Sequence, residues 1–232
     1  MTGKPRLFDI NLYYHLYNCG VEKRDIFSNK NDYRRFLDLI DFYKYGQEIP
    51  YTQFNVLSQK AKELYIDVHP RNEETELLKI ISYSLMPNHF HFLIRVVKND
   101  GVPTFMAKFS NSYTKYFNIK YKRLGSLFQG RYKSKEMPNN HAILQVSRYI
   151  HINSVESEKT NPNHNLKPED YPYSSYPLWI SPNIMNLEGS IVDKEDVDRW
   201  VRFIGGPNKY KDFVEARIGK QPGLEIASLI LE

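Results

Sequence analysis

Apolar residues along the first part of the chain switch between the period of a strand and that of a helix. Residues 8–17 (FDINLYYHLY) are rich in aromatic side chains and carry apolar residues at alternating positions, a pattern typical of a strand. Apolar side chains then recur every three to four positions up to Gly46, which predicts a helix capped by Asn31 or Asp32. No clear period runs through residues 47–78, so we predict an insertion there.

The following residues predict a hairpin and then further elements separated by turn signals. A Met-Pro-Asn turn joins two apolar runs, and a proline placed for a first helical turn precedes a helical period. The predicted elements are strands at 78–84 and 90–97, a helix from Pro103 to near Gly125, a strand at 127–137 and a helix from Asn139 or Asn140 to about Val155.

The order of these elements predicts the fold class. Strand, helix, strand, strand, helix, strand is the order of an α+β, ferredoxin-like split βαβ unit, an antiparallel sheet with helices on one face. We predict one domain at residues 1–155, with the insertion near 47–78 and an extra helix at its end. Residues 156–232 would form a C-terminal loop and helical extension, with helices at 193–204 and 208–218.

Composition excludes several classes of protein. The single cysteine, Cys19, rules out a disulfide framework or a cysteine-ligated zinc site within one chain. The sequence has neither a run of about 18 apolar residues nor an apolar signal segment at its start. We therefore expect a cytoplasmic protein with no membrane partner. Tyrosine is abundant, with 18 among 232 residues, but abundance alone singles out none of them.

The net charge of +5 is unevenly distributed. Residues 103–153 contain nine Lys and Arg against one acid, a charge of +8, so the rest of the chain carries −3. The same span holds five Tyr and four Phe. Basic residues among aromatic ones suit a nucleic-acid partner, since they can follow phosphates while bases stack. The alternative is an amphipathic helix whose polar face is cationic.

Two pairs of residues suggest chemistry on a phosphate. His89 and His91 are two residues apart at the start of a predicted strand, so their side chains point to one face and their Cα atoms lie about 6.6 Å apart. The two imidazoles can converge on a divalent metal. Packed histidines would show the same spacing. Tyr149 and Asn153 lie one helical turn apart, so a tyrosine nucleophile would stand near a neutral oxygen ligand. The metal or nearby Arg148 would have to favour the phenolate. By spacing alone, simple packing explains this second pair better than chemistry does.

Four blocks of sequence together resemble a known family. They are MPNHFHFLI at 86–94, YTKYFN at 113–118, GSLFQGRYKSKEM at 125–137 and RYIHINSV at 148–155. Their order resembles that of the IS200-like, single-tyrosine (Y1) transposases, which include the REP-associated tyrosine transposases of the HUH endonuclease superfamily. The resemblance extends from about Phe8 to the YPYSSY block at 171–176.

This resemblance implies a reaction and a set of roles. His89 and His91 would bind Mg²⁺ or Mn²⁺, Tyr149 would be the nucleophile and Asn153 a third ligand. The family cuts single-stranded DNA that bears hairpins, leaving a 5′-phosphotyrosine and a free 3′-hydroxyl. It includes homodimers, and longer members that act alone, so we expect a monomer or a homodimer.

The sequence departs from the family pattern in three places. Ser154 replaces the usual proline, Asn18-Cys19-Gly20 stands where an Arg-Gly pair is common, and the 47–78 region is longer. These departures leave the chemical groups in place, but the last two can alter DNA recognition.

The remaining candidate residues fall into two groups. Candidates for DNA contacts are Arg131, Lys133, Lys115, Lys122, Arg123 and Arg148. For His15 and His151 we expect packing roles. The alternatives are a non-catalytic protein that binds single-stranded DNA or hairpins on the same fold, and a metal phosphoesterase that would not need Tyr149.

Overall fold

A computed structural model describes residues 6–181, 190–220 and 229 of the chain. Its strands are β1 (Tyr13–Cys19), β2 (Leu78–Met86), β3 (His89–Val96) and β4 (Lys133–Glu136). Its helices are α1 (Lys30–Tyr43), α2 (Tyr51–Asn55), α3 (Gln59–Val68), α4 (Gly101–Lys120), α5 (Asn140–Glu156), α6 (Tyr176–Ile180), α7 (Lys194–Phe203) and α8 (Pro207–Glu215). Two short 3₁₀ helices, η1 (Val21–Lys23) and η2 (Pro168–Asp170), complete the set. Within these ranges no helix has the length and apolar character needed to cross a membrane.

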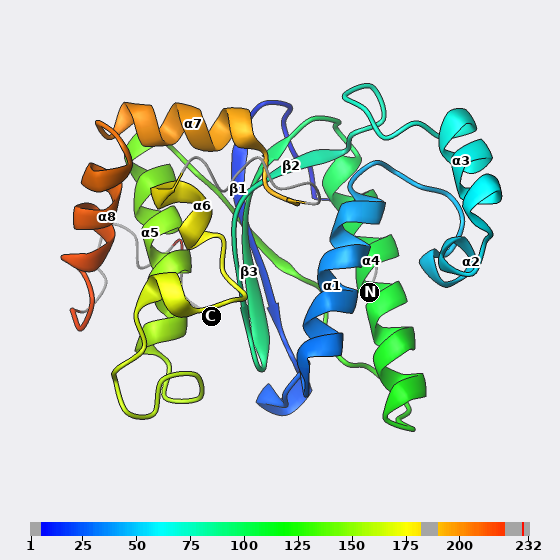
Figure 1. The fold of residues 1–232 in the computed structure, drawn as a ribbon, viewed down its shortest axis with the longest axis horizontal. Coiled ribbons are helices and arrows are strands. Elements are labelled where there is room, and N and C mark those ends of the chain that lie inside the picture. Colours follow the sequence, from blue (N-terminus) through cyan, green and yellow to red (C-terminus); the bar gives the residue numbers. More distant parts are fainter. Residues whose placement is uncertain (1–5, 182–189, 221–228, 230–232) are drawn as a thin grey trace.

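The four strands form one antiparallel sheet in the order β2-β3-β1-β4. Strands β1 and β2 therefore run in the same direction with β3 between them, which is the split βαβ arrangement. Helices α1 and α4 pack side by side on one face, and α5 lies on the opposite face against β2 and β3 (Figure 1). The predicted α+β, ferredoxin-like fold with an extra helix is confirmed.

The alternation of side chains along β3 separates the core from the candidate site. Phe90 and Phe92 point toward α1 and α4, where both pack against Phe36. His89 and His91 must then point to the other face, toward α5. The register pairs His91 with Tyr17 and His89 with Cys19 on β1. A period of two residues thus places both imidazoles on the same side of the sheet.

Two of the predicted strands are shorter than the sequence indicates. The first begins at Tyr13 and not at residue 8, because Asn11 takes a left-handed φ of 64° and Phe8 folds back onto Tyr14. The fourth begins at Lys133 and not at residue 127. Gly130 has a φ of 76°, and the residues before it meet the end of β1 through an isolated bridge between Phe128 and Gly20 and a hydrogen bond from the Gln129 amide to the Cys19 carbonyl. The predicted insertion contains α2 and α3.

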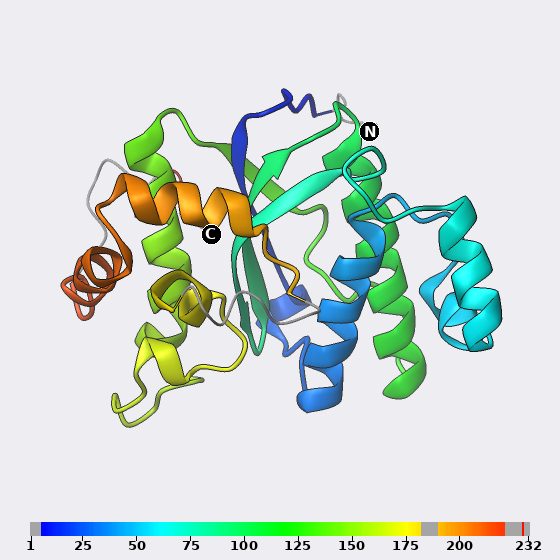
Figure 2. The same ribbon diagram turned by 45° about the horizontal axis from the view of Figure 1, so that its top comes forward.

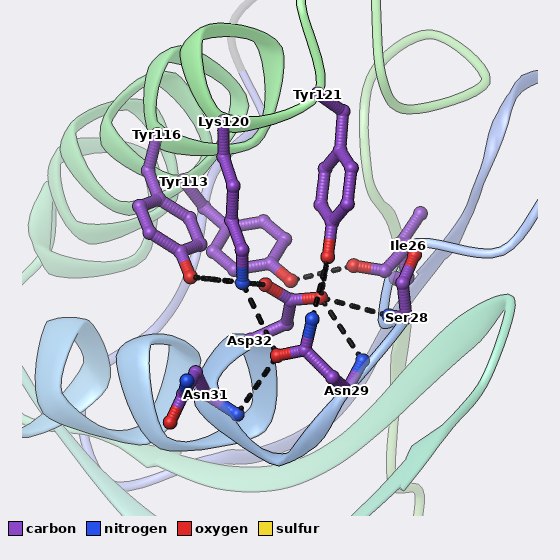
Figure 3. A network of polar contacts seen from close by, with 9 residues as sticks. All are labelled: Ile26, Ser28, Asn29, Asn31, Asp32, Tyr113, Tyr116, Lys120 and Tyr121. Atoms are coloured by element: carbon purple, nitrogen blue, oxygen red, sulfur yellow. Dashed lines mark hydrogen bonds and ion pairs between the residues drawn. The ribbon is translucent and has the colours of Figure 1, made fainter.

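A buried carboxylate, that of Asp32, joins α1 to α4 (Figure 3). Asn29 caps α1, in place of the predicted Asn31 or Asp32, and Asp32 completes a capping box at the third helical position. The carboxylate accepts hydrogen bonds from Lys120 at 2.5 Å, the Tyr116 hydroxyl at 2.9 Å and the Tyr121 hydroxyl at 2.7 Å. One acidic side chain therefore fixes the start of α1 and the end of α4.

The C-terminal helices cover the outer side of α5. Helix α8 packs on α5, and α7 bridges between α8 and the sheet (Figure 2). His151 of α5 is buried between the Tyr210 hydroxyl at 2.7 Å and the Ser175 hydroxyl at 2.9 Å. Burial lowers the pKa of His151 to about 3, so the imidazole is neutral at pH 7. His151 is therefore a packing residue, as the sequence predicts.

Candidate metal and nucleophile site

Two histidines and an asparagine meet between β3 and α5. Nε2 of His89 lies 3.3 Å from Oδ1 of Asn153, and Nε2 of His91 lies 3.5 Å from Nδ2 of the same amide. The rings of His89 and His91 are 5.0 Å apart. The sheet supplies the two imidazoles, and the last turns of α5 bring Asn153 above them. The structure thus brings together the three residues predicted as metal ligands.

Each imidazole has a partner that leaves its Nε2 facing Asn153. Nδ1 of His89 lies 2.8 Å from Oδ1 of Asn88, whose Nδ2 donates to the Lys23 carbonyl, so Nδ1 of His89 carries the proton. Nδ1 of His91 lies 2.9 Å from Nε2 of His15. Metal-bound histidines commonly have this arrangement, in which one ring nitrogen is held by a second residue and the other faces the ion.

The donor set could hold a divalent cation that keeps open positions. Among the described residues, no group of three or more His, Cys, Asp or Glu side chains is placed to hold a metal ion. The available donors are therefore two imidazole nitrogens and the amide oxygen of Asn153. The remaining positions of such a cation would fall to phosphate oxygens and water.

Tyr149 lies one helical turn before Asn153 and is partly exposed. Its ring centroid is 5.4 Å from that of His91 and 6.2 Å from that of His15, edge-on to both. One turn of α-helix, a rise of about 5.4 Å, separates Tyr149 from Asn153. The phenol ring therefore lies beside the histidine pair, on the side of His91 and not of His89. The proposed nucleophile and the proposed ligands thus lie within one chain.

A cavity of about 570 Å³ opens next to His89. Three lysines line it, Lys23, Lys133 and Lys159, together with one acid, Glu158. The remaining lining residues are mostly polar: Tyr17, Asn18, Cys19, Asn88, Gln129 and Ser157. Nζ of Lys133 stands 5.6 Å above the ring of Tyr17. The cavity is a cationic pocket with amide groups and an aromatic surface.

Of the predicted DNA-contacting residues, Lys133 lies nearest to this site. Arg131 is exposed two residues earlier, and Lys122 and Arg123 follow the end of α4. Lys115 lies on α4, across the sheet from α5.

Arg148 takes a different environment from the one predicted. Its guanidinium stacks 4.2 Å from the ring of Phe213 on α8 and donates to the Phe213 carbonyl. The structure therefore places Lys133 near the histidines, whereas Lys115 is exposed on α4 and Arg148 packs against α8.

Several residues of the site were not singled out from sequence. His15 was expected to pack, yet it is fully buried against the candidate ligand His91. The position of His15 near His91 follows from two facts together: side chains alternate along β1, so His15 shares a face with Tyr17, and β1 lies beside β3, where Tyr17 pairs with His91. Lys23 and Lys159 lie outside the strands and α5, where no periodicity could place them.

Part of the chain matches a known protein family. Residues 48–153, just under half of the chain, match the family model described as "Transposase IS200 like". That span runs through β2, β3, α4 and β4 into α5, and includes His89, His91, Tyr149 and Asn153. This match confirms, over residues 48–153, the family resemblance drawn from the motifs.

Two solved structures are similar to the chain. One is a REP-associated tyrosine transposase bound to a REP hairpin, with 13% sequence identity, a TM-score of 0.49, and coverage of 83% of this chain and 94% of that one. The other is described as a transposase from Deinococcus radiodurans, with 15% identity, a TM-score of 0.35, and coverage of 64% and 95%. No curated protein matches the sequence significantly.

Proposed function

We propose that the protein nicks and rejoins single-stranded, hairpin-bearing DNA through a phosphotyrosine on Tyr149. The observation that carries this proposal is the convergence of His89, His91 and Asn153 one helical turn from Tyr149, within a domain that matches the IS200-like transposases. A pair of metal-binding imidazoles beside a partly exposed phenol suits phosphoryl transfer to tyrosine.

His89, His91 and Asn153 would hold the metal, which we take to be Mg²⁺ or Mn²⁺. When bound, such an ion polarises a phosphate oxygen and offsets the charge that develops during transfer. His15 and Asn88 hold the two imidazoles in the orientation that this requires.

The reaction exchanges one phosphate ester for another. The Oη atom of Tyr149 loses its proton and forms a bond to phosphorus, while the bond from phosphorus to the 3′ oxygen breaks. The departing oxygen keeps the electron pair of that bond and takes up a proton, giving a 3′-hydroxyl. Because the phosphotyrosine is itself a phosphodiester, the reverse reaction can reseal a strand without ATP.

A labelled-DNA assay tests the proposal. Hairpin oligonucleotides with randomised single-stranded flanks, labelled at the 3′ end, are incubated with the protein and Mn²⁺ and then denatured. We expect label to migrate with the protein, because the tyrosine retains the downstream strand. The same DNA labelled at the 5′ end should give a free shorter fragment, and EDTA should prevent both products.

Two results would contradict the proposal and favour an alternative. Metal-independent binding of hairpins without any cleavage would indicate a DNA-binding protein on this fold. Cleavage without a covalent adduct would indicate a metal phosphoesterase that uses water in place of Tyr149.

A further inference from the structure

The cationic pocket and Tyr149 lie at opposite ends of the histidine pair. Along α5, Tyr149, Asn153 and Ser157 follow one another at intervals of about 6 Å, and Ser157 lines the pocket. Along β1, His15 lies near Tyr149, Tyr17 pairs with His91, and Cys19 pairs with His89 and lines the pocket. Helix α5 gives the order nucleophile, metal ligand, pocket, and along β1 the pocket extends from Tyr17, level with His91, to Cys19, level with His89, away from His15.

The geometry of in-line displacement determines which side of the scissile phosphate faces the pocket. The attacking and leaving oxygens lie on opposite sides of the phosphorus during phosphoryl transfer. If Oη of Tyr149 attacks from the His91 end, the departing 3′ oxygen must face the His89 end, where the pocket opens. We propose that this pocket binds the nucleoside on the 5′ side of the scissile phosphate. This inference rests on the proposed function.

The lining of the pocket suits a single unpaired nucleotide. A cavity of about 570 Å³ is in the range that encloses a small ligand, and it is too small for a duplex. Lys23 and Lys133 can meet the adjacent phosphates, whereas the ring of Tyr17 is buried and stacks on His15 and His91. The amide of Gln129 is of the kind that reads base edges, while the Asn18 amide is bonded to the Gly130 carbonyl and the Cys19 backbone amide. We therefore expect this nucleotide to contribute to sequence preference.

Substrates with one abasic position test the direction. Once a nicked sequence is known, a single base is removed at each position on either side of the cut. A specific hydrogen-bonded base contact contributes about 1–3 kcal/mol, so loss of the base just 5′ of the cut should slow nicking by roughly 5- to 150-fold. Loss of the base just 3′ should have a much smaller effect. The opposite asymmetry would overturn the pocket assignment while the proposed nicking activity stands.

A binding measurement tests the pocket without any nicking. Short oligonucleotides ending in 2-aminopurine with a free 3′-hydroxyl mimic the released upstream strand, and the fluorescence change reports stacking of that base. We expect saturable binding that Lys133→Gln weakens about tenfold and that Lys60→Gln, at an exposed lysine of α3, leaves unchanged. Equal affinity of Lys133→Gln and the unaltered protein, or no saturable binding, would contradict the proposal even if the protein proved not to cut DNA.

A separate observation concerns His15. Its Nδ1 lies 2.8 Å from the carbonyl oxygen of Leu229, which can only accept, so Nδ1 carries the proton. In a neutral ring, Nε2 then accepts from Nδ1 of His91 at 2.9 Å. This leaves the Nε2 lone pair of His91 facing Asn153. We infer that His15 is a positioning residue that sets the orientation and tautomer of His91 for metal binding.

Two substitutions of similar polarity separate positioning from packing. The side-chain oxygen of His15→Gln can reach the position of Nε2 and accept from His91, whereas His15→Asn is too short. We expect Mn²⁺ titrations followed by electron paramagnetic resonance to show binding about 10- to 100-fold weaker in His15→Asn and near normal in His15→Gln. His164→Asn, at an exposed loop histidine, serves as the control. Equal Mn²⁺ affinity of the two His15 variants, both shown to be folded by circular dichroism, would contradict the inference.

Discussion

Tyr149→Phe is expected to abolish the covalent protein–DNA adduct, with a fall of at least about a thousandfold in its rate of formation. The substitution removes only the Oη atom, so the ring can keep its contacts with His91 and His15 at the same edge-on geometry. Hairpin binding and Mn²⁺ affinity should therefore stay close to those of the unaltered protein. The measurement is the yield of 3′-labelled DNA that remains with the protein after denaturation.

The matched control is Tyr65→Phe on α3, a tyrosine that the fold places beyond α1 and α4 (Figure 1). We expect its adduct yield to be normal. If Tyr149→Phe also forms a normal adduct, another side chain is the nucleophile, and the role assigned to Tyr149 is wrong. If adduct formation and hairpin affinity fall together in Tyr149→Phe, the phenol acts in DNA binding and the chemical assignment is not supported.

Asp32→Asn is expected to lower the free energy of unfolding by about 3 kcal/mol at pH 7. The Asp32 carboxylate is fully buried and accepts hydrogen bonds from one ammonium group and two phenols across the α1–α4 interface (Figure 3). An amide of the same shape has no charge for Lys120 and offers only one acceptor oxygen. Urea denaturation followed by circular dichroism measures the loss. Asp67→Asn, at an exposed position of α3, should change stability by less than about 0.5 kcal/mol.

The same carboxylate makes this loss depend on pH. Burial acts to raise the pKa of Asp32, but hydrogen bonds from Lys120, the Ser28 backbone, Tyr121 and Tyr116 outweigh burial and hold the pKa below its usual value. A group whose pKa is lower in the folded state stabilises the fold above its unfolded pKa, near 3.9, and less as the pH falls through the folded value. The difference between the unaltered protein and Asp32→Asn should therefore shrink below about pH 4. A constant difference down to pH 3 would show that the charge of Asp32 contributes little.

The fold was predictable because its main elements have clear local signals. The 78–97 hairpin has two apolar runs around a Pro-Asn turn, and the structure closes it with that turn between Met86 and His89. Alternation along β3 also predicted that His89 and His91 share one face. Helical spacing placed Tyr149 and Asn153 on one side of α5, and the predicted ligands do meet there. The roles of these residues remain predictions.

The start of β4, the cap of α1 and the pocket depend on contacts between distant segments, so local sequence patterns did not predict them. Residues 127–131 look like a strand, yet Gly130 turns the chain before pairing with β1 begins at Lys133. Asn29, and not Asn31 or Asp32, caps α1. The Asp32 carboxylate instead completes the capping box and also accepts a hydrogen bond from Lys120 of α4. The pocket beside His89 combines residues from β1, the β2–β3 turn and the loop after α5, so no single segment contained its pattern.

The two edges of the sheet are protected from unwanted pairing in different ways. Edge strand β2 bonds to the C-terminal part of the chain, through Leu85 with the Tyr173 carbonyl and Asp193 with the Ile80 carbonyl. Edge strand β4 is only four residues long, and its Lys133 and Lys135 are exposed. Charged lysines on a short edge disfavour pairing with the sheet of another molecule, which is a common route to aggregation. The lysines that we propose for DNA contacts at β4 therefore also disfavour edge-to-edge pairing with another sheet, and removing them would expose a more aggregation-prone edge.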